Sequence, residues 1–250
     1  MAGLYALSRS GGPKSPRFAA YTARVEHEWG LSGYNPMAGP PALEAVRHLL
    51  SLDAETIAAA AAAAVAARCE FDGELTLAIV VASPGMWTDR LATEVQHRTL
   101  AARRPAHGEI LLWNGDVIDV ELVQQESAAE TVRTMWTSIH GEATTLFGVL
   151  SREGLAYALS SNPYGAISPD DCATVEDALS ILGDTTTQGD IAAVLYGDPA
   201  ATALGWTTLG IPEHAGFRWA IARATELIAR IGPRIALSTR PPVLLSSRTQ

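Results

Sequence analysis

The feature that most constrains this fold is a buried-type strand followed directly by a polar helix. Residues 74–82 form an apolar run rich in β-branched residues, and a Ser-Pro-Gly turn at 83–85 separates it from a helical segment over 86–104. Open α/β folds build their sites just beyond the carboxyl ends of sheet strands. The junction after residue 82 is therefore where we expect a functional site.

The helical segment after this strand carries a mixed polar face. Arg90, Glu94, His97 and Arg98 are spaced i, i+4, i+7 and i+8, so they share one side of a helix. We predict that Trp87, Arg90 and Arg98 bind a ligand in a cleft. Glu94 and His97 are the candidate catalytic pair, with the carboxylate orienting the imidazole as a general base. The alternative is an exposed helix face held by salt bridges.

Composition limits the class of protein. The chain has 250 residues and a net charge of −9, so it offers no overall basic surface for nucleic acid or an anionic membrane. Its two cysteines form no disulfide framework and no CxxC zinc pair, which fits a reducing cytoplasm. We expect a cytoplasmic protein with no secretory signal and no membrane span. The sequence is compatible with a homodimer.

The order of predicted elements favours an α/β fold of three layers, with a mixed sheet and an N-terminal helical segment. Residues 1–16 are predicted to be a flexible N-terminus and residues 17–72 the helical segment. Residues 73–231 are predicted to form the α/β domain, and residues 232–250 an extended tail rich in proline.

Several local signals place elements inside the predicted domain. Asn114-Gly115 between apolar runs predicts a β-hairpin over 107–124. Ser127, with Glu130 three residues later, predicts the start of a helix that runs to residue 140. Apolar runs predict two further strands, over 155–160 and 190–196. Helices are expected over 41–50, 54–69, 169–183, 199–209 and 213–230.

The segment 140–182 resembles the bacterial toxin-type cytidine deaminases. It has a His-x-Glu unit, an Asn-Pro loop and a cysteine at a helix start, and the resemblance extends over about 109–196. It implies zinc as a cofactor, with His140 and Cys172 as ligands and Glu142 as the proton shuttle. Pro169 stands where the family has the first of two cysteines.

Two functional hypotheses follow from these observations. The first is an accessory or binding protein whose cleft takes a small molecule or a peptide. The alternative is a metal-dependent hydrolase of the deaminase type, either active or degenerate. The sequence favours the first, because neither candidate active site is complete.

Overall fold

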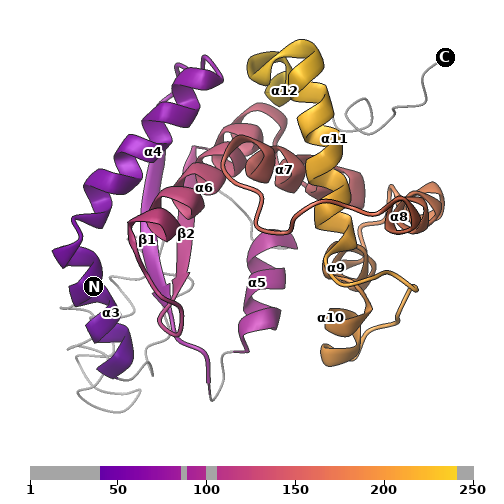
Figure 1. Cartoon of the computed structure of the whole chain (residues 1–250), viewed down its shortest axis with the longest axis horizontal. Coiled ribbons are helices and arrows are strands. Elements are labelled where there is room, and N and C mark those ends of the chain that lie inside the picture. The colour runs from indigo at the N-terminus through magenta and orange to yellow at the C-terminus, as the bar shows by residue number, and fades with distance from the viewer. Residues whose placement is uncertain (1–39, 86–88, 100–105, 241–250) are drawn as a thin grey trace.

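The structure is a computed structural model that describes residues 40–85, 89–99 and 106–240 (Figure 1). The predicted flexible N-terminus and the first part of the predicted helical segment, up to residue 39, lie outside the described residues. The ligand-binding prediction for Trp87 also falls outside them.

A β-α-β unit organises the site. Strand β1 (Thr76–Ala82) leads into helix α5 (Arg90–Thr99) and then strand β2 (His107–Trp113). The two strands are parallel and paired in register, from Thr76 opposite His107 to Ala82 opposite Trp113. Parallel pairing is possible because a crossover separates the strands, and α5 lies in that crossover. The predicted strand and the helix after it are confirmed.

Helices α3 (Pro40–Ser51) and α4 (Ala54–Arg68) lie beside the strands. Leu49 of α3 packs in a small apolar core with Ile110 and Leu112, alternate residues of β2 that share one face of the sheet. In the part of the chain that the structure describes, no single helix is long and apolar enough to cross a bilayer. Helices α3 and α4 reach that length only together, across a bend of 65°.

The rest of the described chain is helical and encloses a larger apolar core. Helix α6 connects the two cores, because Val123 near its start packs in the small one and Val132 in the large one. The helices of this part are α6 (Val120–His140), α7 (Leu146–Leu159), α8 (Pro169–Leu182), α9 (Gln188–Tyr196), α10 (Asp198–Ala203), α11 (Ala215–Ile231) and α12 (Pro233–Ser238).

The structure confirms the predicted mixture of helices and strands but corrects several elements. Residues 155–160 fall almost wholly in α7 and residues 190–196 in α9, so the two strands predicted there are wrong. The predicted hairpin over 107–124 is also wrong, because β2 ends at Trp113 and a helix follows the turn. The described residues therefore contain a sheet of two parallel strands in place of the expected mixed sheet. The tail predicted as extended begins with the short helix α12.

The start of α6 differs from the prediction for a physical reason. Asp119 caps the helix by accepting a 2.8 Å hydrogen bond from the backbone N–H of Leu122. Ser127 and Glu130, predicted to form a capping box, instead lie buried in the middle of the helix. A short polar side chain before an apolar run is typical of both a cap and a buried helix position.

Candidate functional site

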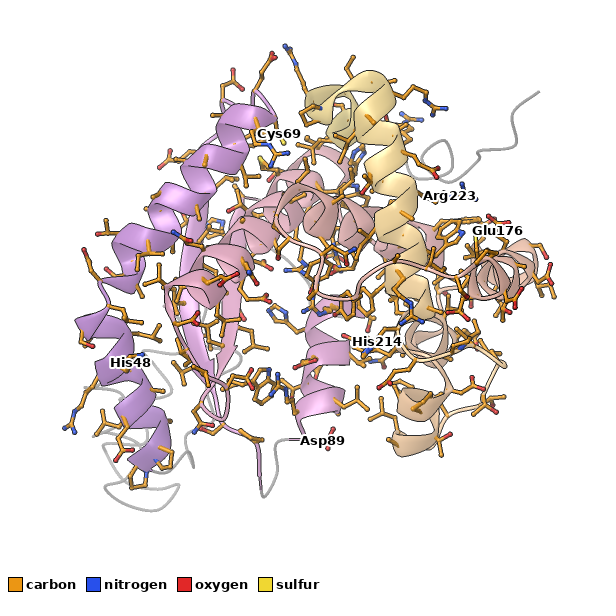
Figure 2. All side chains as sticks on the ribbon, in the orientation of Figure 1. His48, Cys69, Asp89, Glu176, His214 and Arg223 are labelled. Atoms are coloured by element: carbon orange, nitrogen blue, oxygen red, sulfur yellow. The ribbon has the colours of Figure 1, made fainter. Side chains whose placement is uncertain are left out.

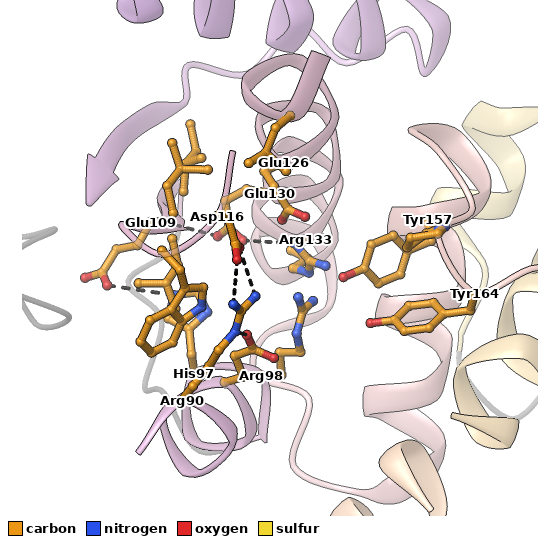
Figure 3. Close-up of a pocket in the computed structure, with 17 residues that line it drawn as sticks. Arg90, His97, Arg98, Glu109, Asp116, Glu126, Glu130, Arg133, Tyr157 and Tyr164 are labelled. Carbon is orange, nitrogen blue, oxygen red and sulfur yellow. Dashed lines mark hydrogen bonds and ion pairs between the residues drawn. The ribbon is translucent and has the colours of Figure 1, made fainter. Parts of the chain in front are cut away.

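A pocket of about 190 Å³ lies beside the carboxyl end of β2 (Figure 3). Its walls come from β2, from α5, from one face of α6 and from Tyr157 and Tyr164 at and after the end of α7. Helix α5 reaches β2 through His97 beside Glu109 and Arg90 beside Trp113, and α6 packs against β2 as well.

The polar face of α5 forms one wall of this pocket. Arg90, Glu94, His97 and Arg98 all line it, so the structure brings the four side chains together as their spacing indicates. The catalytic roles assigned to Glu94 and His97 and the binding roles assigned to Arg90 and Arg98 stay predictions.

Arg90 stands at the rim and is held by two carboxylates. Its Nη1 and Nη2 donate to the two carboxylate oxygens of Asp116 at 2.7 and 2.9 Å, and its Nε donates to Glu94 at 2.9 Å. The guanidinium also lies 5.3 Å from the ring centroid of Trp113. The hydrogen bonds that Arg90 donates to Asp116 raise the pKa of Arg90 further above its usual range. Because three of its five N–H donors bond carboxylates, Arg90 helps to hold the rim in place.

His97 faces β2 across the pocket wall. Its Nε2 lies 3.8 Å from a carboxylate oxygen of Glu109, and both side chains are less than one-fifth exposed. A carboxylate beside an imidazole orients the ring. His97 is therefore better placed than Glu94, which pairs with Arg90, for proton transfer to a molecule in the pocket.

Behind the pocket, a fully buried carboxylate gathers arginines from three helices. Glu153 of α7 accepts from Arg98 Nη1 at 3.0 Å, from Arg133 Nε at 2.9 Å and from Arg152 Nε at 3.0 Å. Arg133 also donates to Glu130 at 3.4 Å. Burial is the largest single effect and opposes the charge of Arg133, but Glu153, Tyr157 and Glu130 together outweigh it, so the pKa of Arg133 is raised and the group stays charged.

One donor of Arg133 has no acceptor. Its Nη2 is buried, and among the residues that the structure describes it has no hydrogen-bond partner. Figure 3 shows the guanidinium groups of Arg98 and Arg133 next to each other, with the hydroxyls of Tyr157 and Tyr164 pointing toward them. These four side chains line the same pocket, and we call them the arginine end of the pocket.

The two tyrosines at this end are neutral donors. Burial raises the pKa of Tyr157 and the pKa of Tyr164, and the negative charge of Glu126 adds to the effect on Tyr157. Arg98 lies 5.4 Å from the ring centroid of Tyr157, and Arg133 lies 5.0 Å from it. Two cations and two hydroxyls therefore converge on one small volume, an arrangement that suits an anion with several oxygens.

The residues of the predicted zinc site have other partners. His140 Nε2 lies 2.8 Å from the carbonyl oxygen of Leu237, and Glu142 is exposed. The thiol of Cys172, at the start of α8, donates to Glu176 at 3.6 Å. Figure 2 shows Glu176 beside Arg223 at the α8–α11 edge. Across the described residues, no three His, Cys, Asp or Glu side chains are arranged to hold a metal ion.

Several site residues were missed in the sequence. Arg133, Tyr157 and Tyr164 lie in segments whose pattern indicates only structural elements, and the position of Glu130 predicts a helix cap. A signal exists in α6, where Glu126, Glu130 and Arg133 repeat at i, i+4 and i+7. Arg152 and Glu153 are a second signal. They are charged residues inside the apolar run 146–159, and charges in such a run are typical of a buried ion pair.

Comparison of the chain with protein-family models, with curated proteins and with solved structures finds no significant match.

Proposed function

We propose that this protein binds a small molecule through a carboxylate or phosphate group, and that the arginine end of the pocket receives that group. The observation that carries the proposal is the buried Nη2 of Arg133, which lacks an acceptor among the described residues. Leaving a buried donor unpaired costs about 1–3 kcal/mol. An anion between Arg98 and Arg133 removes that cost.

The chemistry of the neighbouring groups supports an anion over a neutral ligand. Guanidinium groups present planar pairs of N–H donors that match the oxygens of carboxylates and phosphates. The hydroxyls of Tyr157 and Tyr164 stay protonated because their pKa values are raised by burial, so they add donors without adding negative charge. Such groups are fixed before the ligand arrives, which limits the entropy lost on binding.

The size of the pocket favours a small molecule over a peptide. Its volume of about 190 Å³ corresponds to roughly six water molecules at about 30 Å³ each. Trp113 and Leu122 provide apolar wall for a short carbon frame. A peptide would enter only with its terminal residue. We place the protein in the cytoplasm, where its free cysteines Cys69 and Cys172 would stay reduced.

The test is isothermal titration calorimetry of the protein with sodium hexanoate and, separately, with inorganic phosphate. We expect one of the two anions to bind, and the one that does identifies the anionic group. Tyr164→Phe removes one hydroxyl and should weaken that binding about tenfold, the effect of about 1.5 kcal/mol for a hydrogen bond to a charged group.

Tyr196→Phe is the matched control. Tyr196 is buried, its hydroxyl lacks a partner among the described residues, and it does not line the pocket. This variant should bind as the wild type does. Absence of binding by both anions, or an equal loss in both tyrosine variants, would overturn the proposal.

A further inference from the structure

Helix α6 presents opposite charges along the pocket wall. Glu126, Glu130 and Arg133 follow one another on the face that lines the pocket, as Figure 3 shows. Glu126 and Arg133 are seven residues apart, which corresponds to about 10 Å along a helix axis. The pocket therefore has an acidic residue at some distance from its arginine end.

The carboxylates of the wall differ in how they are neutralised. Glu94 and Asp116 both pair with Arg90 at the rim. Glu130 accepts from Arg133 and, at 3.2 Å, from the backbone N–H of Glu109.

Glu126 is the exception. It lines the pocket and is half-buried, and its carboxylate has no hydrogen bond or ion pair with any residue in the described ranges. A half-buried carboxylate without a cation loses part of its hydration and gains nothing in return. A positively charged ligand group supplies the missing partner, and its burial beside Trp113 and Leu122 strengthens the attraction.

We infer that the ligand is zwitterionic, an amino acid or short amino-carboxylic acid whose anionic group lies at Arg98 and Arg133 and whose ammonium group pairs with Glu126. This inference rests on the proposed function, because it assumes that the arginine end holds the anion. It adds the class of ligand and the residue that selects it.

The experiment compares acids that differ only in an amine. The probes are the ω-amino acids from 4-aminobutyrate to 6-aminohexanoate, each measured by calorimetry against the unaminated acid of the same length. We expect at least one amino acid to bind wild-type protein about tenfold or more tightly than its partner acid, as charge-assisted hydrogen bonds allow. Glu126→Gln should abolish this preference and should not weaken binding of the plain acid, because it removes a negative charge from the pocket wall.

Glu121→Gln is the matched control. Glu121 lies on the same helix, is exposed and accepts a hydrogen bond from Gln125 outside the pocket. The Glu121→Gln variant should still bind the amino acid more tightly than the unaminated acid of the same length.

The outcomes separate the two proposals. Plain acids that bind in a Tyr164-dependent manner with no gain from the amine would overturn the zwitterion and leave the anion site standing. A preference that survives Glu126→Gln would overturn the assignment to Glu126. Failure of every acid and amino acid to bind, while phosphate binds, would overturn the zwitterion alone. Failure of phosphate as well would overturn both proposals.

Discussion

At the scale of single residues, Glu153 decides whether the buried cations behind the pocket are tolerated. Its side chain is fully buried and accepts from Arg98, Arg133 and Arg152, which come from α5, α6 and α7. A buried ion pair adds little over an apolar core, but removal of one partner leaves an uncompensated charge in a medium of low polarity.

Glu153→Gln should therefore lower the free energy of unfolding by about 3–5 kcal/mol. Urea denaturation followed by circular dichroism measures this loss. Glu142→Gln is the control, because Glu142 is exposed and its replacement should change stability by less than about 0.5 kcal/mol. A loss below about 1 kcal/mol for Glu153→Gln would mean that the arginines find other counter-charges.

The same residues show what sequence reasoning could reach. Arg98 was predicted as a ligand-binding residue, because its helix follows a recognisable strand and its polar neighbours repeat at helical spacing. Arg133 was not predicted, because its role depends on which helix packs behind the pocket. Helix packing is set by contacts between residues far apart in the sequence, such as Glu153 with Arg133, and a single sequence does not show them.

At the scale of elements, helices α7 and α11 touch through a glycine. A Cβ at Gly154 would lie 2.5 Å from the carbonyl oxygen of Ala220 and 2.8 Å from its carbonyl carbon, both backbone atoms of α11. Backbone cannot move aside as a side-chain tip can, so the two helix axes would have to separate. Gly154 therefore fixes how closely α7, which carries Glu153 and Tyr157, approaches its neighbour.

Gly154→Ala should lower the free energy of unfolding by about 1–3 kcal/mol, despite the better helix propensity of alanine. Gly148→Ala, in the same helix, provides the comparison. A Cβ there would meet its nearest atoms, in Ala143 and Thr145, at 3.4 Å, so we expect no loss of stability. Equal thermal unfolding temperatures for the two variants would contradict this account of the helix contact.

Local signals at the ends of an element explain which elements could be predicted from the sequence. Helix α8 was predicted because it has local signals at both ends, with Ser168 accepting from the backbone N–H of Asp171 at 3.1 Å and Gly183 following the last turn. The run 155–160 lies far from the Thr145 cap at the start of α7, and the run 190–196 has Gly197 after it but no side-chain cap before it. A short apolar run is equally typical of a buried strand and of a buried helix. Packing inside the large core decides the outcome, and both runs are helical there.

At the scale of the whole molecule, charge is distributed unevenly. The chain has a net charge of −9, yet Arg98, Arg133 and Arg152 are gathered in its interior. The net charge disfavours a basic surface for nucleic acid, which stays a prediction, but it says nothing of a few cations enclosed by helices. An acidic protein can therefore hold an anion site, provided that its arginines are buried around a shared carboxylate such as Glu153.

The pH dependence of global stability provides a test at this scale. His214, before α11, lies 5.0 Å from the ring of Tyr164 and 6.2 Å from that of Tyr196 (centroid distances). Burial lowers the pKa of His214 below its usual 6.5; Arg218 acts in the same direction, and Glu213 and Glu94 oppose it. Near pH 6.5 the unfolded chain then binds more protons than the folded one, so stability rises with pH.

This contribution is complete above the unfolded pKa and is lost as the pH falls through 6.5 toward the folded value. We expect His214→Asn to remove that part of the decline in the free energy of unfolding, measured by urea denaturation at several pH values. Asparagine suits the position because His214 has a left-handed φ of 56°. The wild type should decline more steeply than the variant as pH falls from neutral, because only the wild type must charge an imidazole packed against Tyr164. Parallel profiles for the two proteins would show that the ring is no less basic in the folded state.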